Sequence, residues 1–394
     1  MSFLLHNARI VSPGDPVIPR GDVLIEGDRI VAVAPSIQLI RPPDTVIDAR
    51  GRVLMPGFVD CHTHACFAGS RLDEWDLRRR GATYLEILAA GGGIMSTVRA
   101  VRAASQSQLA DLLRQRLDVM LRGGTTTVEI KSGYGLTLEH ELKMLRAIDD
   151  AASTWPGTVV KTALLGHAVD PDIPDFFNAT IGRTLDAVHA EFPGIAVDVF
   201  CEKGAWPVDQ ARRLLARAVE HGHPVRAHVD QFNSLGFLPI AIALGARSVD
   251  HLEATTAADI GVIAAARDRT VAVGLPVCGF HVDGRYANLR AITDAGGRAA
   301  IATNLNPGSA PSSSMPFAVA LAVRHCGLVV DESIDACTRT AAAVLGLDDR
   351  GVIKPGARAD LVLLDHDDER SLACDVGGNP AAAVICGGTL IGAA

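Results

Sequence analysis

Short apolar runs alternate with polar segments through the middle of the chain. Eight of these runs have the length of a β-strand, and helical periodicity separates most of them. They read LMPGFVD, TTTVEI, VVKTALLG, IAVDVFC, HPVRAHV, ARSVDHL, TVAVGL and AAIAT. The apolar face of one intervening helix consists of Leu109, Leu112, Leu113, Leu117 and Met120. Eight strand–helix units predict an α/β fold, namely a (β/α)8 TIM-like barrel over residues 57–354 rather than an open sheet.

The two ends of the chain have a different pattern. Residues 1–56 contain alternating strand-like runs, separated by turn residues such as Gly27-Asp28 and Pro42-Pro43. Residues 355–394 return to this pattern with ADLVLLD and AAAVICGGTLIG. Neither end is long enough to form a β core alone. We therefore expect residues 1–56 and 355–394 to form one small composite β-sandwich domain.

Composition narrows the class of protein. The chain has 394 residues, 48% of them hydrophobic, which is ample for a deep core. Its net charge of −8 comes without a basic stripe, so we expect neither nucleic acid nor a membrane as partner. The eight cysteines lack CxxC pairing and the first residues lack a signal-peptide pattern, which predicts a cytoplasmic protein with reduced thiols. A homodimer is the default expectation for an oligomer.

The barrel prediction requires chemistry at the C-terminal ends of the strands. His62 and His64 follow the first run and lie two residues apart, so their side chains point to one face. Converging imidazoles suit a divalent zinc or iron ion. A surface histidine pair is the alternative, but the preceding apolar run and Asp60 favour a metal site. His228, at the end of another run, is a plausible third ligand.

Other polar residues also fall at or near strand ends. His251 follows an apolar run, where a core histidine bonded to a carbonyl is the alternative to a functional one. Arg71, Tyr84 and Tyr134 lie in segments after the first two runs, and an arginine with phenolic hydroxyls suits an anionic substrate. The alternative for Arg71, and for residues 78–80, is a solvated helix face.

Longer motifs resemble a known family. PGFVDCHTH and the closing GVIKPGARADLVLLD are similar to the metal-dependent amidohydrolase superfamily. Within it, DCHTHACFAGSR, AGGGIMSTVRA, VEIKSGYGL, DVFCEKGA and NPGSAP resemble the imidazolonepropionase family, in order over nearly the whole chain. The resemblance implies a barrel with an attached β-sandwich and one zinc or iron ion. It also implies hydrolysis of the cyclic amide of 4-imidazolone-5-propanoate to N-formimino-L-glutamate, a step of histidine degradation.

The resemblance also implies roles for individual residues. His62, His64 and His228 would bind the metal, and His251 would lie beside the reacting water. The substrate, a small anionic imidazolone, would contact Arg71, Tyr84, Tyr134, His167, Gln231, Asn306, Gly308 and Ser309.

Asn304 departs from the superfamily pattern, which usually has aspartate as metal ligand and proton acceptor at this position. An asparagine still coordinates through its side-chain oxygen, but it is neutral and has no useful basicity. Gln231 is likewise neutral where some members carry glutamate. We therefore expect Asp230 and His251 to carry the proton, with Asn304 as a neutral metal ligand and Gln231 beside the reacting groups.

Three alternatives remain open at this point. One is a different cyclic amidase or deaminase of the superfamily, with two metals bridged by a carboxylated Lys203. Another is a weakly active or silent binding homologue, for which Asn304 is the main support. A third is that Asn304 is an engineered replacement. The residues do not choose zinc over iron, because imidazole suits both.

Overall fold

The computed structural model describes residues 2–39, 41–82, 86 and 92–393, and it contains the predicted barrel. Eight strands pair in parallel, each with the next along the chain. They are β6 (Phe58–Asp60), β7 (Thr125–Lys131), β8 (Thr158–Gly166), β9 (Ala196–Cys201), β10 (Val225–Val229), β11 (Ser248–His251), β12 (Val271–Gly274) and β13 (Ala299–Ile301). Each coincides with one of the eight apolar runs, so the predicted fold class is confirmed.

The segments that follow β6 and β13 bring the two edges of this sheet together. The Asn304 N–H donates to the His62 carbonyl at 3.0 Å, and the His64 N–H donates to the Leu305 carbonyl at 2.9 Å. The Asp60 carboxylate accepts the Thr303 N–H at 3.1 Å. The barrel is therefore nearly closed, and these contacts set the histidine pair beside the end of β13.

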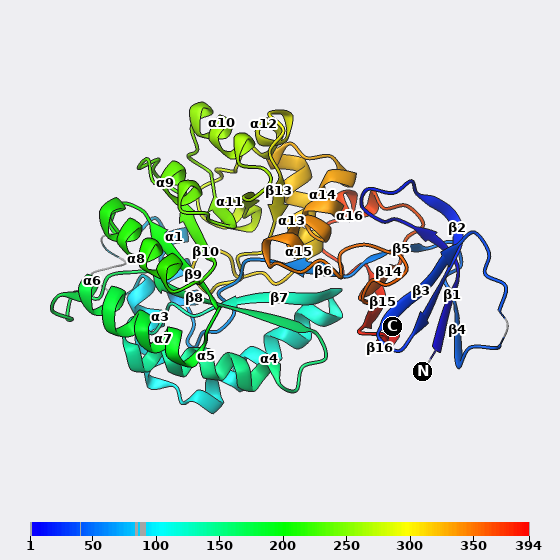
Figure 1. Cartoon of the computed structure of the whole chain (residues 1–394), viewed down its shortest axis with the longest axis horizontal. Coiled ribbons are helices and arrows are strands. Elements are labelled where there is room, and N and C mark those ends of the chain that lie inside the picture. The colour runs from blue at the N-terminus through cyan, green and yellow to red at the C-terminus, as the bar shows by residue number, and fades with distance from the viewer. Residues whose placement is uncertain (1, 40, 83–85, 87–91, 394) are drawn as a thin grey trace.

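Helices cover the outside of the barrel (Figure 1). They are α1 (Leu72–Arg79), α3 (Ile94–Ala103), α4 (Gln106–Arg122), α5 (Leu138–Ala152), α6 (Phe176–Ala179), η1 (Thr180–Thr184), α7 (Leu185–Glu191), α8 (Val208–Glu220), α9 (Leu238–Ala243), α10 (Ala257–Ala265), α11 (Pro276–His281), α12 (Leu289–Asp294), α13 (Met315–Leu321), η2 (Ala322–Cys326), α14 (Val330–Ala336) and α15 (Arg339–Val344). A short α16 (Ser371–Cys374) lies near the C-terminus. Among the helices described, none combines the length and apolar character needed to cross a bilayer.

The predicted helix at residues 109–120 is α4. Ser105 and Gln108 form a capping box at its start, which satisfies N–H groups that the first turn leaves unpaired. Leu109, Leu113 and Leu117 are buried on one face, as their spacing predicts.

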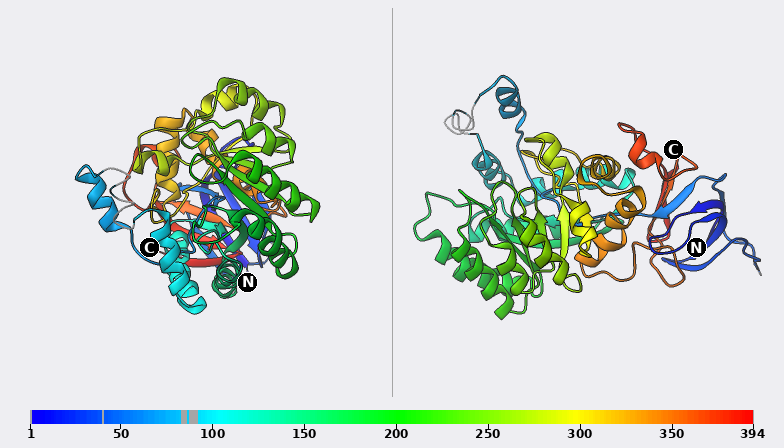
Figure 2. Two further views of the ribbon diagram at one scale, coloured as in Figure 1. Left: turned by 90° about the vertical axis from the view of Figure 1, so that its left-hand side faces the viewer. Right: turned by 90° about the horizontal axis from the view of Figure 1, so that it is seen from above.

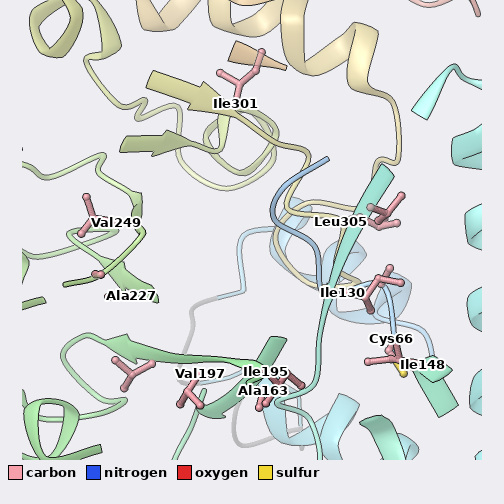
Figure 3. Packing of buried hydrophobic residues seen from close by; sticks show 14 of the residues in the cluster. Cys66, Ile130, Ile148, Ala163, Ile195, Val197, Ala227, Val249, Ile301 and Leu305 are labelled. Atoms are coloured by element: carbon pink, nitrogen blue, oxygen red, sulfur yellow. The ribbon is translucent and has the colours of Figure 1, made fainter. Parts of the chain in front are cut away.

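Side chains alternate between two environments along the barrel strands. The outward side chains of Ile130, Val197, Ala227 and Val249 join one apolar cluster with the inner faces of the helices (Figure 3). The intervening positions face the barrel axis, where charged and imidazole groups replace the usual branched aliphatic residues. This alternation carries the polar side chains into a protected interior.

The two chain ends form one sheet at the far end of the molecule from most of the barrel helices (Figures 1 and 2). Its strands are β1 (Ser2–Ile10), β2 (Ile18–Glu26), β3 (Arg29–Ala34), β4 (Thr45–Asp48), β5 (Val53–Pro56), β14 (Leu361–Leu364), β15 (Ala381–Cys386) and β16 (Thr389–Ala393). Antiparallel pairing of β5 with β14 joins the N- and C-terminal parts. The strands of the two termini thus form one continuous sheet, in which the long β1 pairs with β4 and then β5 along one edge. The division of the chain into a composite β-sandwich domain of residues 1–56 and 355–394 and a barrel domain stays a prediction.

Candidate active site

Three imidazoles meet at the C-terminal end of the barrel. Potential ligand atoms of His62, His64 and His228 all lie within 4.8 Å of one another, and the side chains are buried. The His64 and His228 Nε2 atoms are 3.3 Å apart. Two nitrogens bound to one tetrahedral ion at about 2.0–2.1 Å would be separated by about 3.3–3.4 Å. The spacing therefore fits a single metal ion.

Several buried atoms in and beside this cluster lack hydrogen-bond partners among the described residues. They include His62 Nε2, His64 Nδ1 and the side-chain oxygen of Asn304. An unpaired buried acceptor costs about 1–3 kcal/mol, which a bound cation would offset. Imidazole nitrogens and an amide oxygen are ligands that suit a borderline divalent metal. The residues present thus fit the ion that the sequence predicts.

Carboxylates orient two of the imidazoles. Asp250 lies 2.6 Å from His62 Nδ1, and Asp198 lies 3.1 Å from His228 Nδ1. Each contact leaves Nε2 free for a metal, as in carboxylate–histidine–metal arrangements. Burial lowers the pKa of His62 and His64 well below the usual value, with the Lys131 charge adding to the effect. Both rings are therefore neutral, which is the form that binds metal.

A buried charged layer, formed by Glu129, Lys131, Asp198, Arg226 and Asp250, lies beneath the histidines. The Lys131 ammonium donates to Glu129 at 2.7 Å and to Asp198 at 2.9 Å. The Arg226 guanidinium donates to Glu129 at 3.1 Å and to Asp250 at 2.8 Å. The Lys131–Asp198 contact joins β7 to β9 and the Arg226–Glu129 contact joins β10 to β7, so these two pairs of non-adjacent strands are linked across the barrel interior. The layer fixes the two carboxylates that orient the histidines.

Electrostatics keep this layer charged. Burial alone would raise the pKa of Asp198, but His228 and Lys131 hold it well below its ordinary value. Burial lowers and the neighbouring carboxylates raise the pKa of Arg226, with a net upward result. None of these five residues was predicted from the sequence to have a role in the site. The sequence pattern that could have indicated it is a charged residue two positions from another polar residue within an apolar strand, as at Glu129 and Lys131 on β7.

A cavity of about 440 Å³ opens above the imidazoles. The predicted site residues that line it are His64, Arg71, Tyr134, His167, His228, Gln231, His251, Asn304, Asn306, Gly308 and Ser309. The fold therefore brings together residues that are up to 245 positions apart, counted from His64 to Ser309. Tyr84 lies outside the described residues.

Arg71 faces the cavity with its guanidinium held by a neighbour. Glu74 accepts from Arg71 Nε at 2.6 Å and also contacts Arg78. Burial would raise the pKa of Glu74, but the hydrogen bond from Arg71 lowers it below the usual value. Arg78 also lines the cavity, so it is not simply part of a solvated face. Arg71, Glu74 and Arg78 are three and four residues apart in the sequence, a spacing that predicts one shared helical face.

His167 and Tyr134 form one wall of the cavity. The His167 ring stacks on His64 with centroids 4.8 Å apart, and its Nδ1 lies 3.0 Å from the Gly133 carbonyl. Since that carbonyl only accepts, Nδ1 carries the hydrogen and Nε2 is an acceptor. Burial lowers the pKa of His167 to about 3 and raises that of Tyr134. Both groups are neutral, and the phenol is a hydrogen-bond donor.

The loop after β13 is shaped by Asn306. Its side-chain oxygen accepts the backbone N–H groups of Gly308 and Ser309 at 2.9 and 2.7 Å, and its amide donates to the Asn304 carbonyl. The Asn306 side chain is thus engaged within the loop. Gly308 lies against Arg71, where an added Cβ would be 3.2 Å from Nη1. The loop therefore packs directly on the cationic wall.

Asp230 is the predicted site residue that the fold turns away. Its carboxylate accepts the Thr255 hydroxyl at 3.1 Å, and the residue is absent from the cavity wall. Burial raises the pKa of Asp230 to about 6. The adjacent Gln231 faces the cavity instead, because the left-handed backbone at Asp230, just after β10 ends, breaks the alternation of the strand. Asp230 is therefore poorly placed to exchange a proton there.

Lys203, considered above as a bridging ligand for two metals, is exposed and does not line the cavity. Only its backbone N–H contacts Glu202, at 2.7 Å. The buried lysine near the imidazoles is Lys131, and both of its carboxylate partners already hold it.

Residues at three strand ends have left-handed backbone angles. The φ values are +54° at Asp230, +86° at His251 and +56° at Asn304. Such conformations are uncommon outside glycine, although asparagine and aspartate tolerate them better than most residues. Strain of this kind concentrates at functional sites.

Comparison with known proteins agrees with this geometry. The model of the amidohydrolase family matches residues 53–391. An imidazolonepropionase of Rubrobacter xylanophilus is 44% identical over 380 residues, covering 94% of this chain and 90% of that protein. The imidazolonepropionase of Herpetosiphon aurantiacus is 42% identical over 388 residues, covering 95% and 90%. This chain belongs to the imidazolonepropionases of the amidohydrolase family.

Solved structures share the fold at low identity. A triazine hydrolase variant superimposes with a TM-score of 0.77 at 19% identity, covering 99% of this chain and 94% of that one. The 5-methylcytosine deaminase of Klebsiella pneumoniae gives a TM-score of 0.76 at 16% identity, covering 100% and 98%. These likenesses establish the fold alone. The curated relatives identify this chain as a hydrolase of carbon–nitrogen bonds in cyclic amides.

Proposed function

We propose that this imidazolonepropionase hydrolyses 4-imidazolone-5-propanoate to N-formimino-L-glutamate. The observation that carries the proposal is the buried His62–His64–His228 cluster beneath a cavity with a cationic wall. In the reaction, the oxygen of water bonds to the ring carbonyl carbon and the ring carbon–nitrogen bond breaks. One proton of the water ends on the released nitrogen, so no other reactant is consumed.

The three histidines would hold one zinc or iron ion, with the Asn304 side-chain oxygen as a further ligand. When bound, such an ion polarises a carbonyl group and lowers the pKa of coordinated water. Asp198 and Asp250 fix the rings of His228 and His62, so the ligands need little rearrangement.

The substrate propionate fits the wall formed by Arg71 and Arg78. Glu74 holds the Arg71 side chain in place, which leaves other guanidinium N–H groups for a carboxylate. The neutral Tyr134 phenol is a donor on the same side of the cavity. Fixing the propionate at one end would hold the ring over the imidazoles, where orientation accelerates the reaction.

His251 is the best-positioned proton carrier. It lines the cavity, and its Nδ1 lies 3.2 Å from the Glu253 carboxylate, which orients the ring. Neutral Asn304 and Gln231 supply hydrogen bonds but no base. His251, oriented by Glu253, would therefore move the proton from water to the leaving nitrogen.

His228→Ala tests the proposal. We expect this variant to lose both bound metal and turnover, because it removes a ligand and the imidazole that contacts Asp198. Metal content by mass spectrometry and hydrolysis of 4-imidazolone-5-propanoate are the two measurements. His189→Ala, at a histidine outside the cavity, is the matched control. Wild-type metal content and rate in His228→Ala would refute the ligand assignment.

A second candidate function is substrate binding without turnover, which the amides at positions 231 and 304 favour. The wild-type chain with added zinc or iron would then bind the imidazolone but leave it intact. Product analysis also separates a deaminase, since deamination releases ammonia and ring hydrolysis does not.

A further inference from the structure

A second group of potential metal ligands lies beside the cavity. His251 ends strand β11, Glu253 follows two residues later, and Cys278 lies on α11. One ligand atom from each lies within 4.8 Å of the other two. None of the three belongs to the His62–His64–His228 cluster. Imidazole, carboxylate and thiolate are the ligand types that zinc uses in proteins.

The Glu253 carboxylate points to a missing cation. Its side chain is 5% exposed, and one oxygen lies 3.2 Å from His251 Nδ1. The other oxygen is buried without a hydrogen-bond partner among the described residues. A buried carboxylate oxygen of this kind is costly unless a donor or cation satisfies it.

Cys278 supplies the ligand that selects the ion. Its sulfur lies 3.4 Å from the Gln231 side-chain nitrogen, and the thiol is buried. Thiolates prefer soft or borderline ions such as Zn²⁺ over Mg²⁺ or Ca²⁺. Glu253 and Cys278 lie beside the main cavity, because the small pocket that they line shares Gln231, Phe232 and Val282 with it.

We propose that His251, Glu253 and Cys278 form a second, inhibitory Zn²⁺ site. Binding replaces the thiol proton of Cys278 with a zinc–sulfur bond, and the proton passes to solvent. Burial raises the pKa of this thiol, so zinc binds more tightly as the pH rises. The inhibitory effect rests on the proposed function: zinc on His251 Nδ1 separates the ring from Glu253 and removes the proton carrier.

Cobalt titration tests the site without any assay of turnover. Holoenzyme that already contains one equivalent of metal is titrated with Co²⁺, and the near-ultraviolet thiolate-to-cobalt charge-transfer band is recorded. The three-histidine cluster contains no sulfur, so the band cannot come from the first site, and its loss in a Cys278 variant assigns it to that thiol. We expect it in the wild type and not in Cys278→Ser. Cys201→Ser, at another buried thiol on β9, is the matched control and should keep the band.

Two further measurements complete the test. Glu253→Gln should weaken cobalt binding, which keeps the proposal testable if Cys278→Ser does not fold. Inhibition by zinc is measured with the rate of each enzyme normalised to its own rate without excess zinc. Cys278→Ser should need about 10–100-fold more zinc for half-inhibition, because disturbing the ligation of a metal lowers its affinity by about that factor.

The outcomes separate this proposal from the proposed function. Absence of the charge-transfer band in the wild type, or its persistence in Cys278→Ser, would overturn the site. A normal band with no inhibition by zinc would overturn the inhibitory role. A chain without turnover that still gives the band would retain the second site and reject the proposed function.

Discussion

Asn304 occupies the position where charge matters most at the scale of single residues. Its side-chain oxygen is buried without a partner, and its φ of +56° is one that asparagine and aspartate both tolerate. An aspartate would therefore fit the same backbone while adding a negative charge and a base.

Asn304→Asp should raise the rate of imidazolone hydrolysis by about 10²–10⁴-fold, the usual contribution of a positioned general base. Steady-state kinetics of enzyme that contains one equivalent of zinc or iron would measure it. Asn288→Asp is the matched control, because Asn288 caps α12 and aspartate caps a helix equally well. An unchanged rate in Asn304→Asp would mean that the amide does not limit this enzyme.

Arg71→Ala should raise KM about 10–100-fold with a smaller change in kcat. It removes a charge-assisted hydrogen bond of about 1.5–3 kcal/mol to the substrate carboxylate. Arg114→Ala, on α4 and outside the cavity, is the control for loss of an arginine elsewhere. If KM in Arg71→Ala equals that of the wild type, the propionate binds at another cation.

At the scale of elements, the strand ends connect closure of the barrel with the site. Asp60 ends β6 and accepts hydrogen bonds from the Thr303 N–H and hydroxyl, just after β13. His62 lies two residues after Asp60, and Leu305 lies two residues after Thr303. The Leu305 carbonyl accepts the His64 N–H, so the two segments meet at the histidine cluster. Burial raises the pKa of Asp60 to about 7, despite those hydrogen bonds.

This shift predicts a pH dependence of stability in metal-free protein. Between about pH 4 and pH 7 the folded state holds a proton on Asp60 that the unfolded state releases, so stability falls as pH rises. The contribution of Asp60 to the free energy of unfolding is fully present below about pH 4 and is lost as the pH rises to about 7. It amounts to at most about 4 kcal/mol. Urea unfolding across this range should give a steeper decline in the wild type than in Asp60→Asn. The same slope in both proteins would assign the proton elsewhere.

At the scale of the whole molecule, the terminal sheet anchors the first barrel strand. Strand β5 pairs with β14 and is separated from β6 only by Gly57, whose N–H donates to the Asp360 carbonyl at 2.8 Å. An added Cβ at Gly57 would lie 2.5 Å from the Thr126 hydroxyl oxygen, so this close approach requires glycine. The chain ends therefore set where β6, and hence His62 and His64, begin.

Arg350 tests this coupling. Its guanidinium donates to Thr127 and Thr158 on β7 and β8, at 3.1 and 2.6 Å, and lies 3.6 Å from Asp360 beside β14. Arg350→Met keeps the buried bulk but removes these donors, so we expect a loss of about 1–3 kcal/mol in the free energy of unfolding. Urea denaturation would measure it, with the exposed Arg370→Met as control. Equal losses in both variants would contradict a specific role at this junction.

Local sequence was sufficient for the barrel strands, for α4 and for most of the cavity wall. Apolar runs with period-two alternation specify which side chains point inward, and strand ends of a parallel barrel share one face. His62, His64, His228 and His251 could therefore be grouped before any coordinates were known. Motif resemblance added Gln231 and the substrate contacts of the loop after β13.

Tertiary structure alone decided which neighbours act on these groups. Asp198 and Asp250 orient histidines from strands far away in the chain, and Cys278 meets His251 through the placement of a short helix. Asp230 turns away because the backbone at the strand end takes a left-handed angle that no periodicity predicts. The type of each side chain and the face of the strand or helix on which it lies follow from the local sequence. The distances between side chains of remote segments depend on how those segments pack, and these distances determine which groups are charged and which can bind a metal.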